Sequence, residues 1–149
     1  MKIPEKHTCF HLERRNSQID RNGLFALDSI PARRQVIQYA GEKIPIREAV
    51  RRFWQIERTK GSKRMYLAKL SRGWVIDGAV GGNGSELINH SCDPNLFTKR
   101  ERGTINYYSK RRIRRGEELT VDYRYAPDAV QVPCCCGSAN CRGTINLKR

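Results

Sequence analysis

The chain has 149 residues, of which 38% are hydrophobic, so its length and composition fit one globular domain with a core of its own. No apolar run approaches the roughly 20 residues of a membrane-spanning helix, and the amino-terminal residues lack the apolar stretch of a secretory signal. We therefore expect an intracellular protein without membrane contact, in the cytoplasm, nucleus or nucleoid, whose six cysteines are metal ligands or free thiols.

The net charge is +14, from 29 Lys and Arg residues against 15 Asp and Glu residues. Such an excess favours nucleic acid or another acidic partner, although a solubilising surface has the same composition. The charge is densest at residues 110–115, with the sequence KRRIRR. This run is typical of a phosphate-binding patch or a nuclear address, and equally of the exposed connection of a hairpin.

The expected elements are short. Runs bounded by Gly, Asn, Asp and Pro predict strands at residues 24–27, 36–40, 65–70, 74–77, 104–109 and 118–123. Between the second and third strands, apolar residues from Ile46 to Trp54 recur with helical spacing and predict a helix over about residues 46–58. We expect Trp54 and Trp74 to lie in the core. The pattern indicates a mostly β protein with one clear helix.

Three closely spaced cysteines near the C-terminus form the pattern C-x-C-x4-C: Cys134, Cys136 and Cys141. Thiolates at this spacing can turn back onto one ion, and a structural zinc site prefers four ligands. Cys135 points away by alternation. The fourth ligand has to come from elsewhere, and the spacing alone leaves both Cys9 and Cys92 open.

A second candidate metal site is the alternating run His7, Cys9 and His11, which would share one face of a strand. Three ligands on a single strand are strained. We therefore favour a buried Cys9 between exposed histidines.

Four segments in chain order carry known motif patterns: YAGEKI at residues 39–44, GNGSELINHSCDPN at 82–95, GEELTVDY at 116–123 and CCCGSANCRG at 134–143. In their order and spacing they resemble the signature of SET-domain protein lysine methyltransferases. The resemblance implies an α+β, mostly β SET fold with short helices, in which several small curved sheets surround a knot-like C-terminal crossing. It divides the chain into an extension (1–16), a SET domain (17–126) and a post-SET zinc-binding tail (127–149).

The resemblance also implies what the spacing left open. In this family the cysteine of N-H-S-C joins the post-SET triplet, so Cys92 is the implied fourth zinc ligand beside Cys134, Cys136 and Cys141. The C-terminal crossing would bring Asn89 and His90 close to Tyr123.

The implied activity is transfer of methyl groups from S-adenosylmethionine to the side-chain amine of a lysine in a protein substrate, such as a histone or another basic or chromatin protein. Tyr123 and Tyr66 are the implied catalytic residues. The implied cofactor contacts are Asn22, Gly23, Leu24, Tyr66, Asn89, His90 and Tyr123. Val121 and Tyr125 are the implied walls of the lysine channel, and we expect a monomer.

Three positions depart from the family pattern. Arg21 replaces the first glycine of an early G-x-G turn, although Asn22 and Gly23 tolerate a positive φ there. Glu86 stands where the family has arginine. Val121 stands where a Phe or Tyr often tunes how many methyl groups are added. With the high charge, these departures keep open a second hypothesis, a catalytically weak, zinc-stabilised basic module that binds nucleic acid.

Overall fold

The computed structural model describes residues 1–2, 7–58 and 66–148. Its elements in chain order are β1 (Leu12–Asn16), β2 (Asn22–Ala26), β3 (Gln35–Gln38), β4 (Glu42–Pro45), α1 (Ile46–Arg58), β5 (Leu67–Lys69), β6 (Trp74–Asp77), the 3-10 turn η1 (Ser85–Leu87), β7 (Asn89–His90), β8 (Leu96–Glu101), β9 (Thr104–Ser109) and β10 (Thr120–Val121). The mostly β class is confirmed. Met65, the start of one predicted strand, lies outside the described residues.

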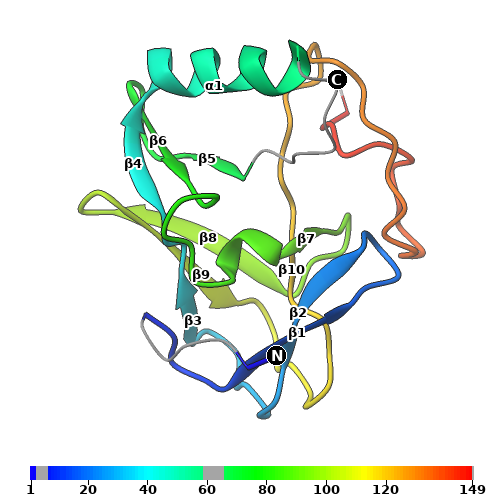
Figure 1. The fold of residues 1–149 in the computed structure, drawn as a ribbon. Helices are drawn as coiled ribbons and strands as arrows, with labels where there is room; N and C mark the ends of the chain where they lie inside the picture. Colours follow the sequence, from blue (N-terminus) through cyan, green and yellow to red (C-terminus); the bar gives the residue numbers. More distant parts are fainter. Residues whose placement is uncertain (3–6, 59–65, 149) are drawn as a thin grey trace.

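The strands form four small sheets. β1 pairs with β2, β3–β9–β8 and β4–β6–β5 form antiparallel sheets of three strands, and β7 pairs with β10 in parallel. Figure 1 shows α1 across one end of the molecule, beside β4, β5 and β6, with β1 and β2 toward the other end. Strands β1, β4, β7 and β8 were not predicted, because their residues mix charges with too few apolar positions to alternate clearly.

The main core joins side chains from β2, β3, β8, β9 and β10 into one cluster. Leu24, Ile37 and Ile105 in that cluster are almost completely buried. Removing such apolar side chains from water is the principal source of stability. Tyr39 and Tyr107 belong to the same cluster, so the core fixes two rings that also face a cavity.

Helix α1 has the predicted bounds, but the prediction that Trp54 and Trp74 lie in the core is wrong. Trp54 is 57% exposed and Trp74 is 44% exposed, while Ala49 is the buried residue of the helix. The sheet under α1 has three short strands and offers a small apolar cluster with Ile44 and Val75. The periodicity identified which residues lie on one face of the helix. It did not show that the sheet is too small to cover that whole face.

The pairing of β10 with β7 brings distant segments together. Val121 lies opposite His90 in register, and the Tyr123 N–H donates to His90 Nδ1 at 3.1 Å. The predicted approach of Tyr123 to Asn89 and His90 is therefore confirmed. The predicted strand at 118–123 is shortened to Thr120–Val121, since the preceding residues bond to β2 instead, with the Leu119 N–H donating to Leu24 O.

The basic run at residues 110–115 connects β9 to the segment before β10. Its Ile113 is fully buried and exchanges backbone hydrogen bonds with Ile30, while the five Lys and Arg side chains around it are exposed. None of the described helices is long and apolar enough to cross a membrane.

Candidate active site and metal centre

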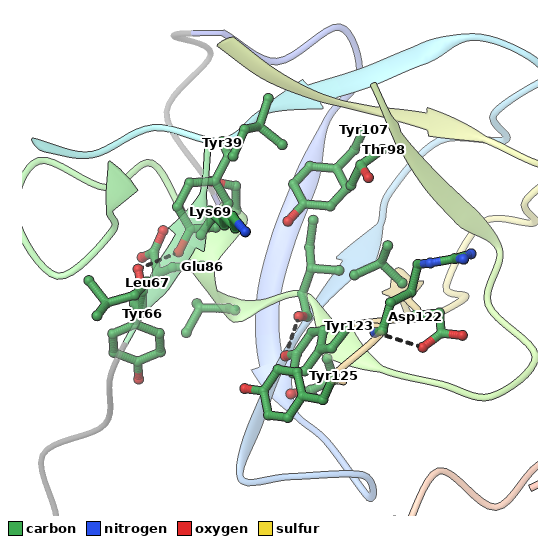
Figure 2. Close-up of a pocket in the computed structure, with 18 of the residues that line it drawn as sticks. Tyr39, Tyr66, Leu67, Lys69, Glu86, Thr98, Tyr107, Asp122, Tyr123 and Tyr125 are labelled. Atoms are coloured by element: carbon green, nitrogen blue, oxygen red, sulfur yellow. Dashed lines mark hydrogen bonds between the residues drawn. The ribbon is translucent and has the colours of Figure 1, made fainter. Parts of the chain in front are cut away.

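A cavity of about 790 Å³ opens between the β8–β9 strands, η1 and the segment that follows β10. Five tyrosines line it: Tyr39, Tyr66, Tyr107, Tyr123 and Tyr125. Figure 2 shows them grouped on two sides of the cavity, with Tyr123 and Tyr125 together on one side. The walls thus combine aromatic rings with charged side chains, among them Arg21, Lys69 and Glu86. Such a pocket suits an apolar stem that ends in a polar group.

Tyr123 is held from several directions. Its hydroxyl donates to the Ile88 carbonyl at 2.8 Å, and its ring stacks on Tyr125 with the centroids 5.9 Å apart. Its ring also meets His90 edge-on, with the centroids 5.4 Å apart. Because the proton points at Ile88, the lone pairs of the Tyr123 oxygen can accept a hydrogen bond from a bound molecule.

His90 links Tyr123 to the cysteines. Nδ1 accepts from the Tyr123 N–H and therefore carries no proton, which leaves Nε2 as the donor, 3.4 Å from Cys92 Sγ. Burial lowers the pKa of His90 below its usual value, despite the Asp122 carboxylate near it. His90 is 4% exposed and is not among the residues that line the cavity, so its role as a cofactor contact stays a prediction.

The Asn89 side chain closes a buried polar network. Its amide donates to Glu118 Oε1 at 2.8 Å and to the Asn22 carbonyl at 3.0 Å, and Ser17 Oγ donates to the same carboxylate at 2.8 Å. Ser17 and Glu118 were not among the predicted site residues. The GEEL pattern at residues 116–119 contained the signal for Glu118, but nothing in the sequence pointed to Ser17.

The predicted cofactor residues fall into two groups. Asn22, Tyr66, Asn89 and Tyr123 line the cavity, as do the two predicted channel residues Val121 and Tyr125. Leu24 is fully buried in the core, and Gly23 backs onto Glu118.

The early turn differs from expectation in its backbone. The residue with positive φ is Arg21, at 38°, and not Asn22 or Gly23. Gly23 is needed for a different reason, because a Cβ atom there would lie 2.2 Å from Glu118 Oε1. Arg21 itself lines the cavity.

Glu86 brings a carboxylate to the cavity wall where the family has arginine. Its Oε2 accepts from the Gly84 N–H at 2.9 Å, and its side chain packs against Gly78 and Gly82. The reversed charge is therefore accommodated locally by a backbone donor and by two residues without side chains.

The four predicted zinc ligands come together. The sulfur atoms of Cys92, Cys134, Cys136 and Cys141 all lie within 4.8 Å of one another, and those of Cys92 and Cys134 are 3.8 Å apart. Ligands at about 2.3 Å from a tetrahedral zinc are separated by about 3.8 Å, so the set fits this ion. Cys135 is exposed and outside the group, as expected.

Backbone donors surround these sulfurs. The Cys92 N–H lies 3.5 Å from Cys136 Sγ, and the Arg142 N–H lies 3.4 Å from Cys92 Sγ. Burial opposes ionisation of Cys136, but the hydrogen bonds from Cys92 and Ser138 outweigh it and lower the pKa of the Cys136 thiol to about 5. Amide donors of this kind stabilise thiolates and orient them for a metal.

The alternative metal site at His7, Cys9 and His11 is not supported. Among the described residues, the group that could hold a metal is the four cysteines. His7, Cys9 and His11 are all exposed. His11 Nδ1 lies instead 2.8 Å from Asp28. The expected burial of Cys9 is wrong, since this residue lies in an irregular segment before β1.

The tail that carries three of the cysteines is fixed next to Tyr123. Arg142 makes two parallel bonds of 2.9 Å to the Asp122 carboxylate. Asn146 is fully buried and bonds to the backbone of Ala126 and Val132. The four-cysteine group, the tail and the residue before Tyr123 therefore form one connected unit.

These features define a SET domain followed by a four-cysteine centre. Residues 21–124 match the SET domain in a comparison with protein families. Because the match covers more than half of the chain, the protein belongs to the SET-domain family.

Its relatives include proteins named histone-lysine N-methyltransferase. Human SETD1B and Dictyostelium discoideum set1 are each 39% identical to this chain over 134 residues. The Schizosaccharomyces pombe histone-lysine N-methyltransferase, H3 lysine-4 specific, is also 39% identical over 134 residues. The similarity covers 87% of this chain but 7%, 9% and 14% of those three proteins, so the chain spans a small part of their length.

Proposed function

We propose that this chain transfers methyl groups from S-adenosylmethionine to the side-chain amine of a lysine in a protein. The observation that carries the proposal is the cavity in which Tyr123, fixed through Ile88 and His90, lies beside four other tyrosines. The family and its named relatives support the same reaction.

The reaction is an in-line displacement. S-adenosylmethionine would supply an electrophilic methyl carbon on a sulfonium; the amine lone pair forms the new N–C bond as the C–S bond breaks, the sulfur leaves as a neutral thioether, and the charged amine releases one proton to solvent. The aromatic walls would desolvate the lysine and lower its pKa toward the neutral, reactive form. Tyr123 would accept a hydrogen bond from the amine and align it.

Histone H3 is our first candidate substrate, because one relative is named for a lysine of H3. A chain of charge +14 repels a basic peptide unless carboxylates meet it locally. Glu86 and Asp20 line the cavity and can do so. Asp122 also lines it, but Arg142 already bonds both oxygens of its carboxylate. Asp77 is 6% exposed and bonded to Arg52, so it is occupied elsewhere.

Zinc would be held by Cys92, Cys134, Cys136 and Cys141 and would act as a structural clamp between the tail and β7. An intracellular location, with the nucleus or nucleoid among the alternatives, and a monomeric state are part of the same proposal.

The test measures labelled methyl groups transferred from S-adenosylmethionine to recombinant histone H3 and to a protein lysate. We expect Tyr123→Phe to lower the rate by at least about 100-fold, because misalignment alone costs that much. Tyr108→Phe is the matched control, since Tyr108 lies on the opposite face of β9, with its hydroxyl 3.5 Å from Gln35 Oε1. Failure of the wild type to bind S-adenosylmethionine, together with tight salt-dependent binding of DNA or RNA, would favour the nucleic-acid-binding module instead.

A further inference from the structure

The loop between β2 and β3 and the loop between β9 and β10 gather exposed cations on one surface. Figure 1 shows both loops at the end of the molecule away from α1, and Ile30 of the first pairs with Ile113 of the second. Ser109 fastens them, because it is fully buried, its N–H donates to the Arg34 carbonyl at 2.9 Å, and its hydroxyl donates to the Pro31 carbonyl at 2.6 Å. The exposed cations of the two loops form what we call the basic platform: Arg33, Arg34, Lys110, Arg111, Arg112, Arg114 and Arg115.

Carboxylates neutralise only part of the basic platform. Arg111 is bonded to Glu117 at 2.5 Å. The carboxylates of Asp93 and Asp28 act on Arg111 and Arg115 from a longer distance. The six cations other than Arg111 make no ion pair with any residue that the structure describes. Like charges that the fold holds together repel one another, and a bound polyanion relieves that repulsion.

The backbone under these side chains is fixed. Ile113 is fully buried and exchanges two backbone hydrogen bonds of 2.9 Å with Ile30. Since neighbouring side chains alternate along an extended segment, Arg112 and Arg114 point outward where Ile113 points into the core. The run at residues 110–115 is therefore part of the folded surface and not a free basic peptide, which favours the phosphate-binding patch over the nuclear address.

Arg33 has an unusual backbone conformation for its position in the first loop. Its φ is 60°, in the left-handed region that is costly for a residue with a Cβ atom, and its N–H donates to the Ser109 carbonyl at 2.8 Å. A glycine adopts this conformation freely, so the turn itself does not require an arginine. Strained residues of this kind cluster at binding sites, which is a second reason to expect a ligand at this surface.

We propose that the basic platform binds the phosphate backbone of double-stranded DNA without reading its sequence. Guanidinium groups bind phosphate oxygens through paired hydrogen bonds, and the platform is mainly arginine. Residues 28–35 and 109–117 contain no aromatic side chain on which unpaired bases could stack, which favours a duplex over a single strand. The inference does not depend on the reaction in the cavity. A chain held on DNA meets the basic proteins bound to the same DNA at a high local concentration.

The experiment measures binding of the full chain to a short fluorescent DNA duplex of mixed sequence over a range of salt concentrations. It compares Arg112→Gln/Arg114→Gln with Arg47→Gln/Arg58→Gln, which removes the same charge from exposed positions of α1 at the other end of the molecule. We expect the platform variant to bind at least about tenfold more weakly at about 0.1 M salt, with the salt slope reduced by about 2, because each lost phosphate contact lowers it by about 0.9. The α1 variant should stay close to the wild type.

Arg33→Gly separates a binding role from a structural one. Glycine takes the left-handed turn without strain, so this variant should keep the Tm of the wild type and still bind the duplex more weakly. A lowered Tm with unchanged binding would show that the Arg33 side chain is structural and would count against the platform.

Equal losses in the platform and α1 variants would overturn the inference, because net charge alone would then hold the DNA. Tighter binding of single-stranded RNA or of polyglutamate than of the duplex would overturn the choice of partner. Methyl transfer to protein by a chain that does not bind the duplex would refute the platform alone. Duplex binding by a chain that methylates no protein would contradict the proposed function and leave the platform standing.

Discussion

Glu118 is the residue on which one wall of the cavity depends. Its carboxylate accepts from Ser17 and Asn89, and its tip fills the space left open at Gly23. These contacts join β2, β7 and the segment before β10 through one side chain. Asn89, which belongs to the family motif, is therefore as much a structural donor as a candidate cofactor contact.

Gly23→Ala tests this arrangement. A methyl group at this position would lie 2.2 Å from Glu118 Oε1, which the bonds from Ser17 and Asn89 prevent from moving freely. We expect a loss of about 1–3 kcal/mol in the free energy of unfolding, typical of overpacking, measured by denaturant titration. Gly73→Ala is the control, because nothing lies within 4 Å of a Cβ there. Equal stability of the two variants would show that the carboxylate is not fixed.

The sequence identified some of these residues and missed others for a physical reason. Cys92 and Tyr123 carry motif letters, so the family resemblance alone selected them. Ser17 acts through the partner that folding gives it, since its hydroxyl donates to Glu118, 101 positions away. Ser17 does not stand out by type or spacing, and only the folded structure reveals its contacts.

For α1 and for the C-terminal tail, the sequence predicted one part of the arrangement and missed another. The apolar spacing gave the bounds of α1, but its exposed Trp54 depends on the small sheet below. The cysteine spacing predicted a metal centre, but not that Arg142 and Asn146 fasten the tail to the rest of the domain. The bonds of these two side chains to Asp122, Ala126 and Val132 join residues that lie 14 to 20 positions apart in the sequence.

Arg142→Lys should loosen the tail. A lysine cannot make two parallel bonds to Asp122 and also reach the carbonyls of Ile145 and Asn146. We expect a cost of about 2 kcal/mol and faster amide hydrogen exchange in residues 142–147. Arg51→Lys, whose ion pair with Glu48 is exposed on α1, should change neither quantity measurably. Unchanged exchange in residues 142–147 would mean that the four-cysteine centre alone holds the tail.

For the whole molecule, the four-cysteine centre connects the C-terminal tail to the residues beside the cavity. Cys92 is two residues from His90, whose ring contacts the Tyr123 backbone. Metal analysis should find about one zinc per chain, and chelation should expose the tail to protease and weaken S-adenosylmethionine binding together. A metal-free chain that binds the cofactor normally would contradict this coupling.

We propose that the fold places a lysine amine beside Tyr123. The most direct measurement is to hydrolyse protein labelled by the wild type with radioactive S-adenosylmethionine and to identify the labelled amino acid. We predict label in Nε-methylated lysine, at least about 100-fold weaker when Tyr123→Phe replaces the wild type. Label in methylarginine or in nucleic acid, or no label in protein at all, would contradict the account.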